Sequence, residues 1–472
     1  MADTRDSLVP LSGKNPIDGL LDRSGWVKEG DKAVLTWSAH NSGGVWTASE
    51  LAQVRAAFAA WSNVANIEFL ELTGGGSFRF SAADIAMTAS GGKLMIYEDA
   101  VGLAFLPVYD PTPTPLFGQV FSVDEYPHPE GDVFIDNPET GSFNPGSTDF
   151  ATLLHEIGHA LGLKHPHDAP RTFAQLGLLP KDVVQWTVMS YETIPGSTLR
   201  VGWPVTPMPY DILAIQYLYG ANMEYRTGDD VYTLATDGTY RTLWDAGGVD
   251  TLDGSGLMIG TTISLVAGTF TLHGARSATA VAFNVVIENA IGTQGNDVLK
   301  GNGAANDLAG GSGNDELNGA GGSDLLRGGT GADLLKGGTG ADSLLGNAGN
   351  DRFFFDPQDV SVNGGPGLDQ LVIIGRGQTL NLVTLDDGRL MELELIDLTG
   401  TGNNTLRLDA DEVLGISSST NILRVMGNAG DRVYTGGGWE DAADRSIGGQ
   451  LYHQFTHDGA TLFIDADISV FT

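Results

Sequence analysis

Three histidines and a glutamate lie close together in the segment HEIGHALGLKHP, which begins at His155. His155 and His159 are four residues apart, so on an α-helix their rings share one face and can reach a single metal ion. Glu156 lies beside them, where it can act on an open position of that ion without being a ligand. Gly162 allows the chain to leave the helix and bring His165 round as a third ligand.

Three neutral imidazoles leave zinc a fourth position for water, whose pKa falls towards neutrality on binding. Glu156 would take a proton from this water during attack on a peptide carbonyl and return it to the leaving amine. The short pattern HExxH also occurs by chance, but HExxHxxGxxH is much more specific. Met189 lies 24 residues after His165, and Tyr191 follows two positions later.

This combination resembles the metzincin zinc peptidases, and its Met-Ser-Tyr sequence resembles the serralysins in particular. The resemblance implies that Met189 forms an apolar floor under the histidines. It also implies that Tyr191 is a displaceable zinc ligand and that its phenol stabilises the tetrahedral intermediate. By the same resemblance, the segment with Ala104, Phe105 and Leu106 binds the substrate backbone by strand addition.

The sequence departs from the serralysins after the third histidine. The loop between His165 and Met189 is shorter than is usual in that family, so the pocket rim and the substrate preference are not carried over. His167 and Asp168 are interpreted as solvated loop residues rather than as further metal ligands.

Other elements must position this centre. Helical periodicity and capping signals predict α-helices over residues 47–65, 148–162 and 209–220. Apolar runs bounded by Gly, Pro and Asp predict strands over 67–72, 93–98, 101–108 and 131–137.

A nonapeptide repeat, GGxGxDxUx, begins at Gly292 and continues to Phe354. Six residues make a turn in which glycines permit the backbone angles and an aspartate supplies a carboxylate, and the next three form a short strand. Residues 355–363 break the pattern, which returns in the same frame at 364–372. The inward-facing eighth positions form an apolar spine of Leu299, Leu308, Leu317, Leu326, Leu335, Leu344 and Phe353.

The repeat resembles the parallel β-roll of secreted RTX proteins, in which calcium lies between turns stacked two repeats apart. Oxygen ligands and clustered negative charge suit calcium better than a transition metal. One side of the roll carries Asp297, Asp315, Asp333, Asp351 and, if the frame survives the interruption, Asp369. The other side carries Asn306, Asp324, Asp342 and then Val360. We therefore expect more calcium on the first side and a weak site at Asn306.

The family resemblance also assigns a calcium site before the repeat. Its ligands would be the backbone carbonyls of Arg226, Gly228 and Asp230, together with Asp245, Gly247 and Asp250.

Charge and composition narrow the class of protein. The chain of 472 residues has 25 basic and 59 acidic residues, and this net charge of −34 disfavours binding to nucleic acid and to anionic membranes. The chain has no cysteine, which excludes disulfides and thiolate metal sites. It shows neither an ordinary N-terminal secretory signal nor an apolar run long enough to span a membrane. Because calcium is scarce in the cytosol, the repeat favours a chain that is exported unfolded and folds outside.

These patterns predict an α+β metzincin catalytic domain followed by an all-β parallel β-roll and a C-terminal β module. The expected boundaries are 1–11 for a propeptide-like leader, 12–222 for the peptidase domain, 223–372 for the roll and 373–472 for a module that serves secretion.

The expected function is that of a secreted, extracellular zinc endopeptidase with one catalytic zinc and several structural calcium ions. Its partners would be protein or peptide substrates and a type I secretion machinery. We expect a monomer without nucleic acid or stable membrane insertion. The alternative is a secreted calcium-binding surface or adhesion protein with a vestigial peptidase domain.

Overall fold

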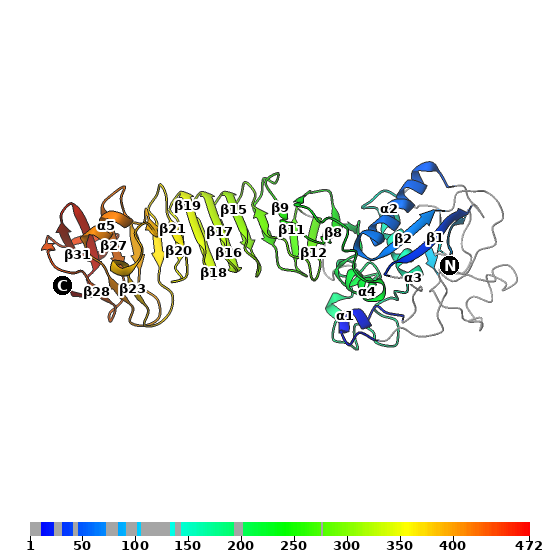
Figure 1. Ribbon diagram of the computed structural model, residues 1–472, viewed down its shortest axis with the longest axis horizontal. Helices are drawn as coiled ribbons and strands as arrows, with labels where there is room; N and C mark the ends of the chain where they lie inside the picture. Colours follow the sequence, from blue (N-terminus) through cyan, green and yellow to red (C-terminus); the bar gives the residue numbers. More distant parts are fainter. Residues whose placement is uncertain are drawn as a thin grey trace. The chain divides into compact units, whose positions relative to one another are not determined.

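The computed structural model describes residues 11–22, 31–40, 46–71, 84–90, 102–104, 133–136, 143–192, 202–274 and 277–472. The chain divides into two compact units (Figure 1). Unit 1 comprises Met1–Gly228, Thr236–Gly248 and Ala267–Val285. Unit 2 comprises Asp229–Ala235, Val249–Val266 and Val286–Thr472.

Unit 1 contains a five-stranded sheet with the order β2-β1-β3-β5-β4. Its strands are β1 (Ala33–His40), β2 (Ile67–Glu71), β3 (Asp84–Ser90), β4 (Gly102–Ala104) and β5 (Val133–Asp136). The first four in spatial order are parallel, and β4 is antiparallel to β5. Strands β2, β4 and β5 match predicted strands, whereas β1 and β3 were not predicted. The predicted strand over 93–98 lies outside the described residues.

The helices of unit 1 are α1 (Asn15–Asp18), α2 (Ala48–Val64), α3 (Thr148–Ala160), α4 (Pro209–Tyr219) and the 3-10 helix η2 (Leu179–Lys181). The three longer helices confirm the predicted ones to within two residues. Helix α2 begins at the predicted capping box, in which Thr47 Oγ1 accepts from the Glu50 amide and the Glu50 carboxylate accepts from the Thr47 amide. Helix α2 packs on α3, and Trp61 Nε1 donates to the carbonyl of Leu154 at 3.2 Å.

A second sheet in unit 1 has the order β11-β12-β8-β6. Its strands are β6 (Trp203–Pro204), β8 (Thr239–Leu243), β11 (Phe270–His273) and β12 (Ser277–Val281).

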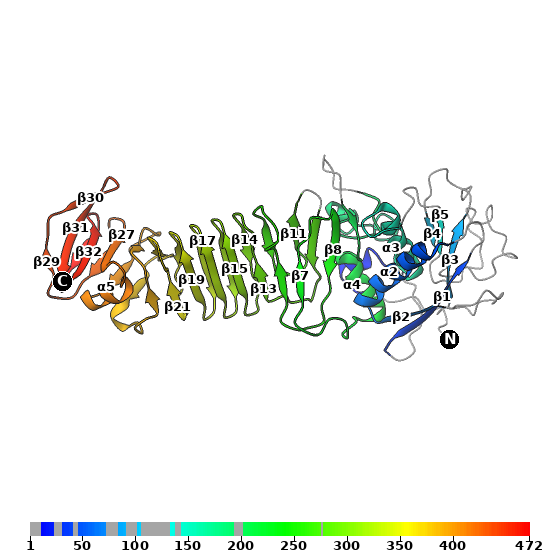
Figure 2. The same ribbon diagram turned by 90° about the horizontal axis from the view of Figure 1, so that it is seen from above.

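Unit 2 is built on two long sheets whose strands stack in parallel through the repeat (Figure 2). One sheet contains β7 (Val231–Thr233), β9 (Thr251–Asp253), β13 (Asn289–Ile291), β15 (Asp307–Ser312), β17 (Leu325–Thr330), β19 (Ser343–Ala348), β21 (Ser361–Asn363) and β24 (Leu390–Met391). The other begins with β10 (Thr262–Ser264), β14 (Val298–Lys300), β16 (Glu316–Gly321), β18 (Leu334–Thr339), β20 (Arg352–Phe354) and β22 (Gln370–Val372).

The repeat therefore forms the predicted parallel β-roll. Each strand pairs with the strand 18 residues later, as in Leu317↔Leu335 and Leu335↔Phe353. All seven spine residues are fully buried, so the spine supplies the apolar interior of the roll. The register continues through the segment that breaks the pattern, because Ser343 pairs with Ser361 and Val362 is fully buried.

The C-terminal residues extend the second long sheet beyond β22. The added strands are β25 (Leu395–Asp397), β27 (Ile422–Met426), β32 (Ala460–Asp465), β31 (Gln450–His457), β29 (Glu440–Asp441) and β30 (Arg445–Ile447). A further four-stranded parallel sheet contains β23 (Thr379–Asn381), β26 (Thr405–Arg407), β28 (Arg432–Tyr434) and β33 (Ser469–Phe471). Helix α5 (Ala410–Ile416) and the 3-10 helix η3 (Leu382–Thr384) complete this part. Among the described residues, no helix has both the length and the apolar character needed to cross a bilayer.

Candidate metal centre and carboxylate ladders

Helix α3 and the turn after it bring the three predicted histidines together. The helix begins at Ser147, whose hydroxyl accepts from the Phe150 amide at 3.1 Å. Gly162 follows the helix with φ of 101°, a conformation that favours glycine, and the chain then turns back. As a result, His165 Nε2 lies 3.2 Å from His155 Nε2 and 3.0 Å from His159 Nε2.

The other ring nitrogen of each histidine contacts an oxygen atom. His155 Nδ1 lies 2.7 Å from the Val188 carbonyl, and His159 Nδ1 lies 2.8 Å from the Leu163 carbonyl. His165 Nδ1 lies 2.8 Å from Asp168 Oδ2. These acceptors require a proton on each Nδ1, which leaves the three Nε2 lone pairs directed at one another. This donor set fits a zinc ion, because zinc-binding histidines commonly donate their second N–H to a carbonyl or a carboxylate.

The environment keeps the histidines neutral. Burial lowers the pKa of His155 well below its usual value, and the neighbouring histidines lower it further. Burial also lowers the pKa of His159 to about 3 and reduces that of His165. Neutral imidazoles are the form that binds metal, so the site is ready for a cation at physiological pH.

Met189 is fully buried and packs against α3, the helix that carries His155 and His159. A Cβ atom placed on Gly158 would lie 2.6 Å from the Met189 sulfur, so this sulfur packs directly against the backbone of α3. Any larger residue at position 158 would therefore displace the methionine.

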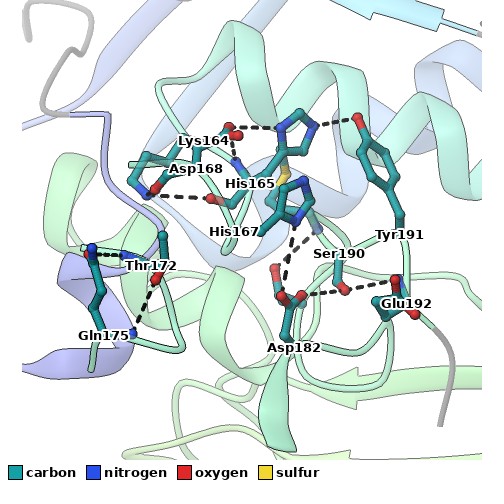
Figure 3. Close-up of polar contacts among 12 residues, drawn as sticks. Lys164, His165, His167, Asp168, Thr172, Gln175, Asp182, Ser190, Tyr191 and Glu192 are labelled. Atoms are coloured by element: carbon teal, nitrogen blue, oxygen red, sulfur yellow. Dashed lines mark hydrogen bonds and ion pairs between the residues drawn. The ribbon is translucent and has the colours of Figure 1, made fainter. Parts of the chain in front are cut away.

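The Tyr191 hydroxyl reaches the same point as the three histidines. Its oxygen lies 2.5 Å from His165 Nε2, and the ring is 65% exposed (Figure 3). Desolvation of the hydroxyl, with the nearby Glu156 and Asp168 carboxylates, raises the pKa of Tyr191 to about 12. The phenol therefore stays protonated at neutral pH and can donate a hydrogen bond.

Glu156 is buried beside the histidines, and this burial raises its pKa to about 8. A cation held by the histidines would oppose this shift, because a nearby positive charge favours the carboxylate.

Asp168 is half exposed, as expected for a loop residue, but its side chain also contacts the third histidine. Its Oδ2 accepts from both the ring and the backbone amide of His165, and Lys164 Nζ donates to its backbone carbonyl at 2.6 Å (Figure 3). Asp168 therefore fixes the orientation of the third histidine. The sequence signal was its position three residues after His165, a spacing at which a side chain can return to the same turn.

His167 also contacts His165, the third candidate ligand. Its ring stacks on that of His165 with 4.9 Å between centroids and an interplanar angle of 5°. On its other side, His167 Nδ1 lies 4.0 Å from Asp182 Oδ2, and Asp182 Oδ1 accepts from the Ser190 hydroxyl at 2.6 Å. This network joins the loop of His165 to the loop that carries Tyr191 (Figure 3).

Asp211, in the first turn of α4, supports the methionine turn and was missed by the sequence reasoning. Its carboxylate accepts from the amides of Val188 and Met208 and from the Thr187 hydroxyl. Since Val188 in turn accepts from His155, this buried carboxylate is linked to a candidate ligand through one residue. Burial raises the pKa of Asp211 to about 7, although its hydrogen bonds oppose the shift. Only its position near a helix start was visible in the sequence.

The segment proposed to bind substrate is described only in part. Ala104 ends β4, which is the last strand in the order of the five-stranded sheet, and it pairs with Val133. Phe105 and Leu106 lie outside the described residues.

In unit 2, the repeat aspartates form two ladders along the roll. In each step, the amide of one residue donates to the Oδ1 atom of the aspartate 18 residues later, at 2.7–2.9 Å. The first ladder runs through Asp297, Asp315, Asp333, Asp351 and Asp369, and the second through Asn306, Asp324 and Asp342. The first ladder thus continues past the interruption to Asp369.

The second carboxylate oxygen distinguishes the ladder members. In six aspartates this oxygen is buried and has no hydrogen-bond partner among the described residues. These are Asp315, Asp324, Asp333, Asp342, Asp351 and Asp369. Both oxygens of Asp297 accept hydrogen bonds, from Thr261 and Thr293, and Asn306 has no carboxylate. Unpaired buried oxygens are costly, so these six aspartates have the donor chemistry that calcium would satisfy.

The site predicted ahead of the repeat involves residues of both units. Arg226, Gly228, Asp245 and Gly247 belong to unit 1, and Asp245 Oδ1 accepts from the Gly247 amide at 2.8 Å. Asp230 and Asp250 belong to unit 2, where the Asp230 amide donates to Asp250 Oδ1 at 2.8 Å.

Two family models match this chain. Residues 26–175 match the model described as Matrixin, and residues 218–418 match the model described as Peptidase M10 serralysin C terminal. The chain is 37% identical over 270 residues to serralysin of Proteus mirabilis, covering 53% of each chain. It is 35% identical over 286 residues to serralysin G of Dickeya chrysanthemi, covering 55% of each.

These alignments span about half the length of the curated relatives. The Matrixin model includes the three histidines, and the serralysin C-terminal model includes the whole predicted roll, in the order expected from the sequence. Over these residues the chain is similar to the serralysins and to other M10 peptidases.

Proposed function

We propose that the protein is a secreted zinc endopeptidase that cleaves extracellular proteins and is stabilised by calcium in its roll. The observation that carries this proposal is the convergence of three Nε2 atoms at 3.0 and 3.2 Å, while each Nδ1 contacts an oxygen. Lone pairs arranged in this way repel one another unless a cation lies among them. The similarity to the serralysins supports the same activity.

When bound, zinc would supply a Lewis acid that polarises the peptide carbonyl and lowers the pKa of water. His155, His159 and His165 would hold it. Glu156 takes a proton from the attacking water and passes it to the leaving amine, which regenerates the carboxylate. The Tyr191 hydroxyl donates a hydrogen bond to the negative charge that develops on the carbonyl oxygen.

The remaining assignments are proposals of the same kind. The peptidase domain would span 12–222 after a leader of residues 1–11, the calcium-binding roll 223–372 and the secretion module 373–472. The aspartates with unpaired oxygens support calcium binding by the roll. A type I secretion machinery would export the chain before calcium folds it.

Hydrolysis of casein by the purified protein, loaded with zinc and calcium, tests the activity. Glu156→Gln keeps the size of the side chain but removes the base, so we expect about 10²–10⁴-fold lower activity with unchanged zinc content. The matched control is Glu192→Gln, an exposed glutamate whose carboxylate is not used in the proposed mechanism.

If zinc-loaded wild type cleaves neither casein nor a peptide library, the peptidase proposal is wrong. Calcium binding without cleavage would support the alternative of a calcium-binding surface protein. Cleavage of the library would reveal the preferred side chains around the scissile bond.

A further inference from the structure

The segment that interrupts the nonapeptide repeat carries an aspartate outside the repeat pattern. Asp359 occupies the fifth position of its nonapeptide, and Val360 replaces the usual aspartate at the sixth. From the repeat alone, the second ladder would end at Asp342. Asp359 is nevertheless only 1% exposed, so the fold buries this carboxylate at the end of that ladder.

The turn around Asp359 fixes its side chain. The amide of Asp359 donates to the Asp356 carbonyl at 3.0 Å, and the Asp356 amide donates to Asp359 Oδ2 at 2.9 Å. These reciprocal hydrogen bonds occupy one carboxylate oxygen. The other, Oδ1, is buried and has no hydrogen-bond partner among the described residues.

The turn also lies directly beside Asp342. Strands β19 and β21 pair in register, and the Val360 amide donates to the Asp342 carbonyl at 2.7 Å. Asp342 is fully buried, and its Oδ2 likewise has no partner among the described residues. Two adjacent segments therefore each contribute a buried, unpaired carboxylate oxygen.

In the described part of the chain, no ion pair joins a basic side chain to any of these aspartates. The pKa of Asp359 is raised to about 7, chiefly by burial and also by the Asp342 and Asp356 carboxylates, whereas the hydrogen bond from the Asp356 amide opposes the shift. Arg389 is close enough to oppose this shift weakly, but its guanidinium donates to the carbonyl of Pro357. Uncompensated carboxylates inside a protein are costly, and a bound cation would remove the cost.

We propose that Asp342 and Asp359, with Asp356 beside them, form a calcium site that lies outside the GGxGxDxUx pattern. The donors are carboxylate oxygens, and calcium binds oxygen ligands in an irregular arrangement of six to eight. The site would add one calcium ion at the end of the second ladder, beyond its last repeat aspartate, Asp342. It adds to the calcium-binding part of the proposed function and does not depend on peptidase activity.

Calcium counting on the full-length protein tests this site. Wild type and Asp359→Asn are dialysed against calcium that saturates wild type, and bound calcium per chain is measured by mass spectrometry. We expect the variant to bind one ion fewer. The matched control is Asp307→Asn, which removes a half-buried roll aspartate that pairs with Arg327, and it should bind as many ions as wild type.

A second measurement covers the case in which Asp359→Asn does not fold. Crystals of wild type soaked with terbium should give an anomalous peak between the Asp342 and Asp359 carboxylates. An unchanged ion count in a folded variant, or the absence of that peak, overturns the site, and a proton shared by the two carboxyls would then explain their burial. Wild type that binds no calcium would also overturn the calcium part of the proposed function.

Discussion

At the residue scale, the candidate metal centre depends on the Nδ1 atom of each histidine as much as on the Nε2 atom that would bind the metal. The three Nδ1 atoms contact two backbone carbonyls and one carboxylate, and these contacts direct the Nε2 atoms to one point. Only the contact of Asp168 is made by a side chain. It can therefore be changed by mutation without altering a ligand.

Asp168→Asn tests the role of this contact. The amide oxygen can still accept from His165 but lacks the negative charge that makes the imidazole more basic. We expect zinc affinity to fall by about 10–100-fold, the range typical of such outer contacts. Competition with a fluorescent zinc chelator measures the affinity. Glu192→Gln removes a charge elsewhere and should leave the affinity unchanged, and equal affinities in all three proteins would contradict the assigned role.

At the element scale, the roll combines a spine of apolar side chains with ladders of buried carboxylates. The spine packs without any ion, whereas the ladders place acidic groups of neighbouring coils next to each other. The stability of the roll should therefore depend on whatever neutralises these carboxylates.

Acid should stabilise the calcium-free roll. Burial raises the pKa of Asp315 to about 6 and those of Asp333 and Asp369 to about 7, above the value of about 4 expected for an unfolded chain. Folding thus favours the protonated form. The resulting stability is fully present below about pH 4 and is lost as pH rises through 6 to 7.

Urea unfolding followed by circular dichroism in a calcium chelator measures this dependence. We expect a higher midpoint at pH 5 than at pH 8. With saturating calcium the order should reverse, because protons then compete with the ion for the same oxygens. A chelated roll that is less stable at pH 5 than at pH 8 would show that the ladder carboxylates do not control its stability.

At the scale of the whole molecule, the C-terminal strands continue the stacking of the roll. Among the described residues beyond Asp369, no buried carboxylate oxygen lacks a hydrogen-bond partner. Both carboxylate oxygens of Asp431 accept from backbone amides, those of Asn404 and Asn428, at 2.7 Å. Asn404 in turn accepts from the Gln378 amide at 2.9 Å. In this part of the chain, backbone amides satisfy the kind of buried carboxylate oxygen that calcium would satisfy in the repeat.

Removal of calcium by a chelator should therefore destabilise one region of unit 2 more than another. We expect amides of residues 310–350 to lose protection from hydrogen exchange in a chelator, and amides of 405–434 to keep most of theirs. Mass spectrometry of peptic fragments from the full-length protein reports both regions in one experiment. The same protein in calcium is the reference. Equal loss of protection in both regions would show that the C-terminal strands depend on the calcium-loaded roll.

The parts of this protein that were predictable from sequence are those set by local periodicity. The helical repeat alone brings His155 and His159 to one face, and the nonapeptide period alone aligns the spine and the ladder aspartates. Strand β1 could also have been predicted, because Ala33, Leu35 and Trp37 alternate as buried residues of a strand do.

Only the tertiary structure decided which groups support these residues. Asp211 reaches the methionine turn from α4, and this contact between residues 23 positions apart follows from helix packing rather than from any local pattern. Asp359 is out of frame with the repeat, and its burial beside Asp342 appears only when β21 stacks on β19. Periodic sequence specifies ligands because each repeat obeys the same local geometry, whereas their hydrogen-bond partners depend on how distant segments pack.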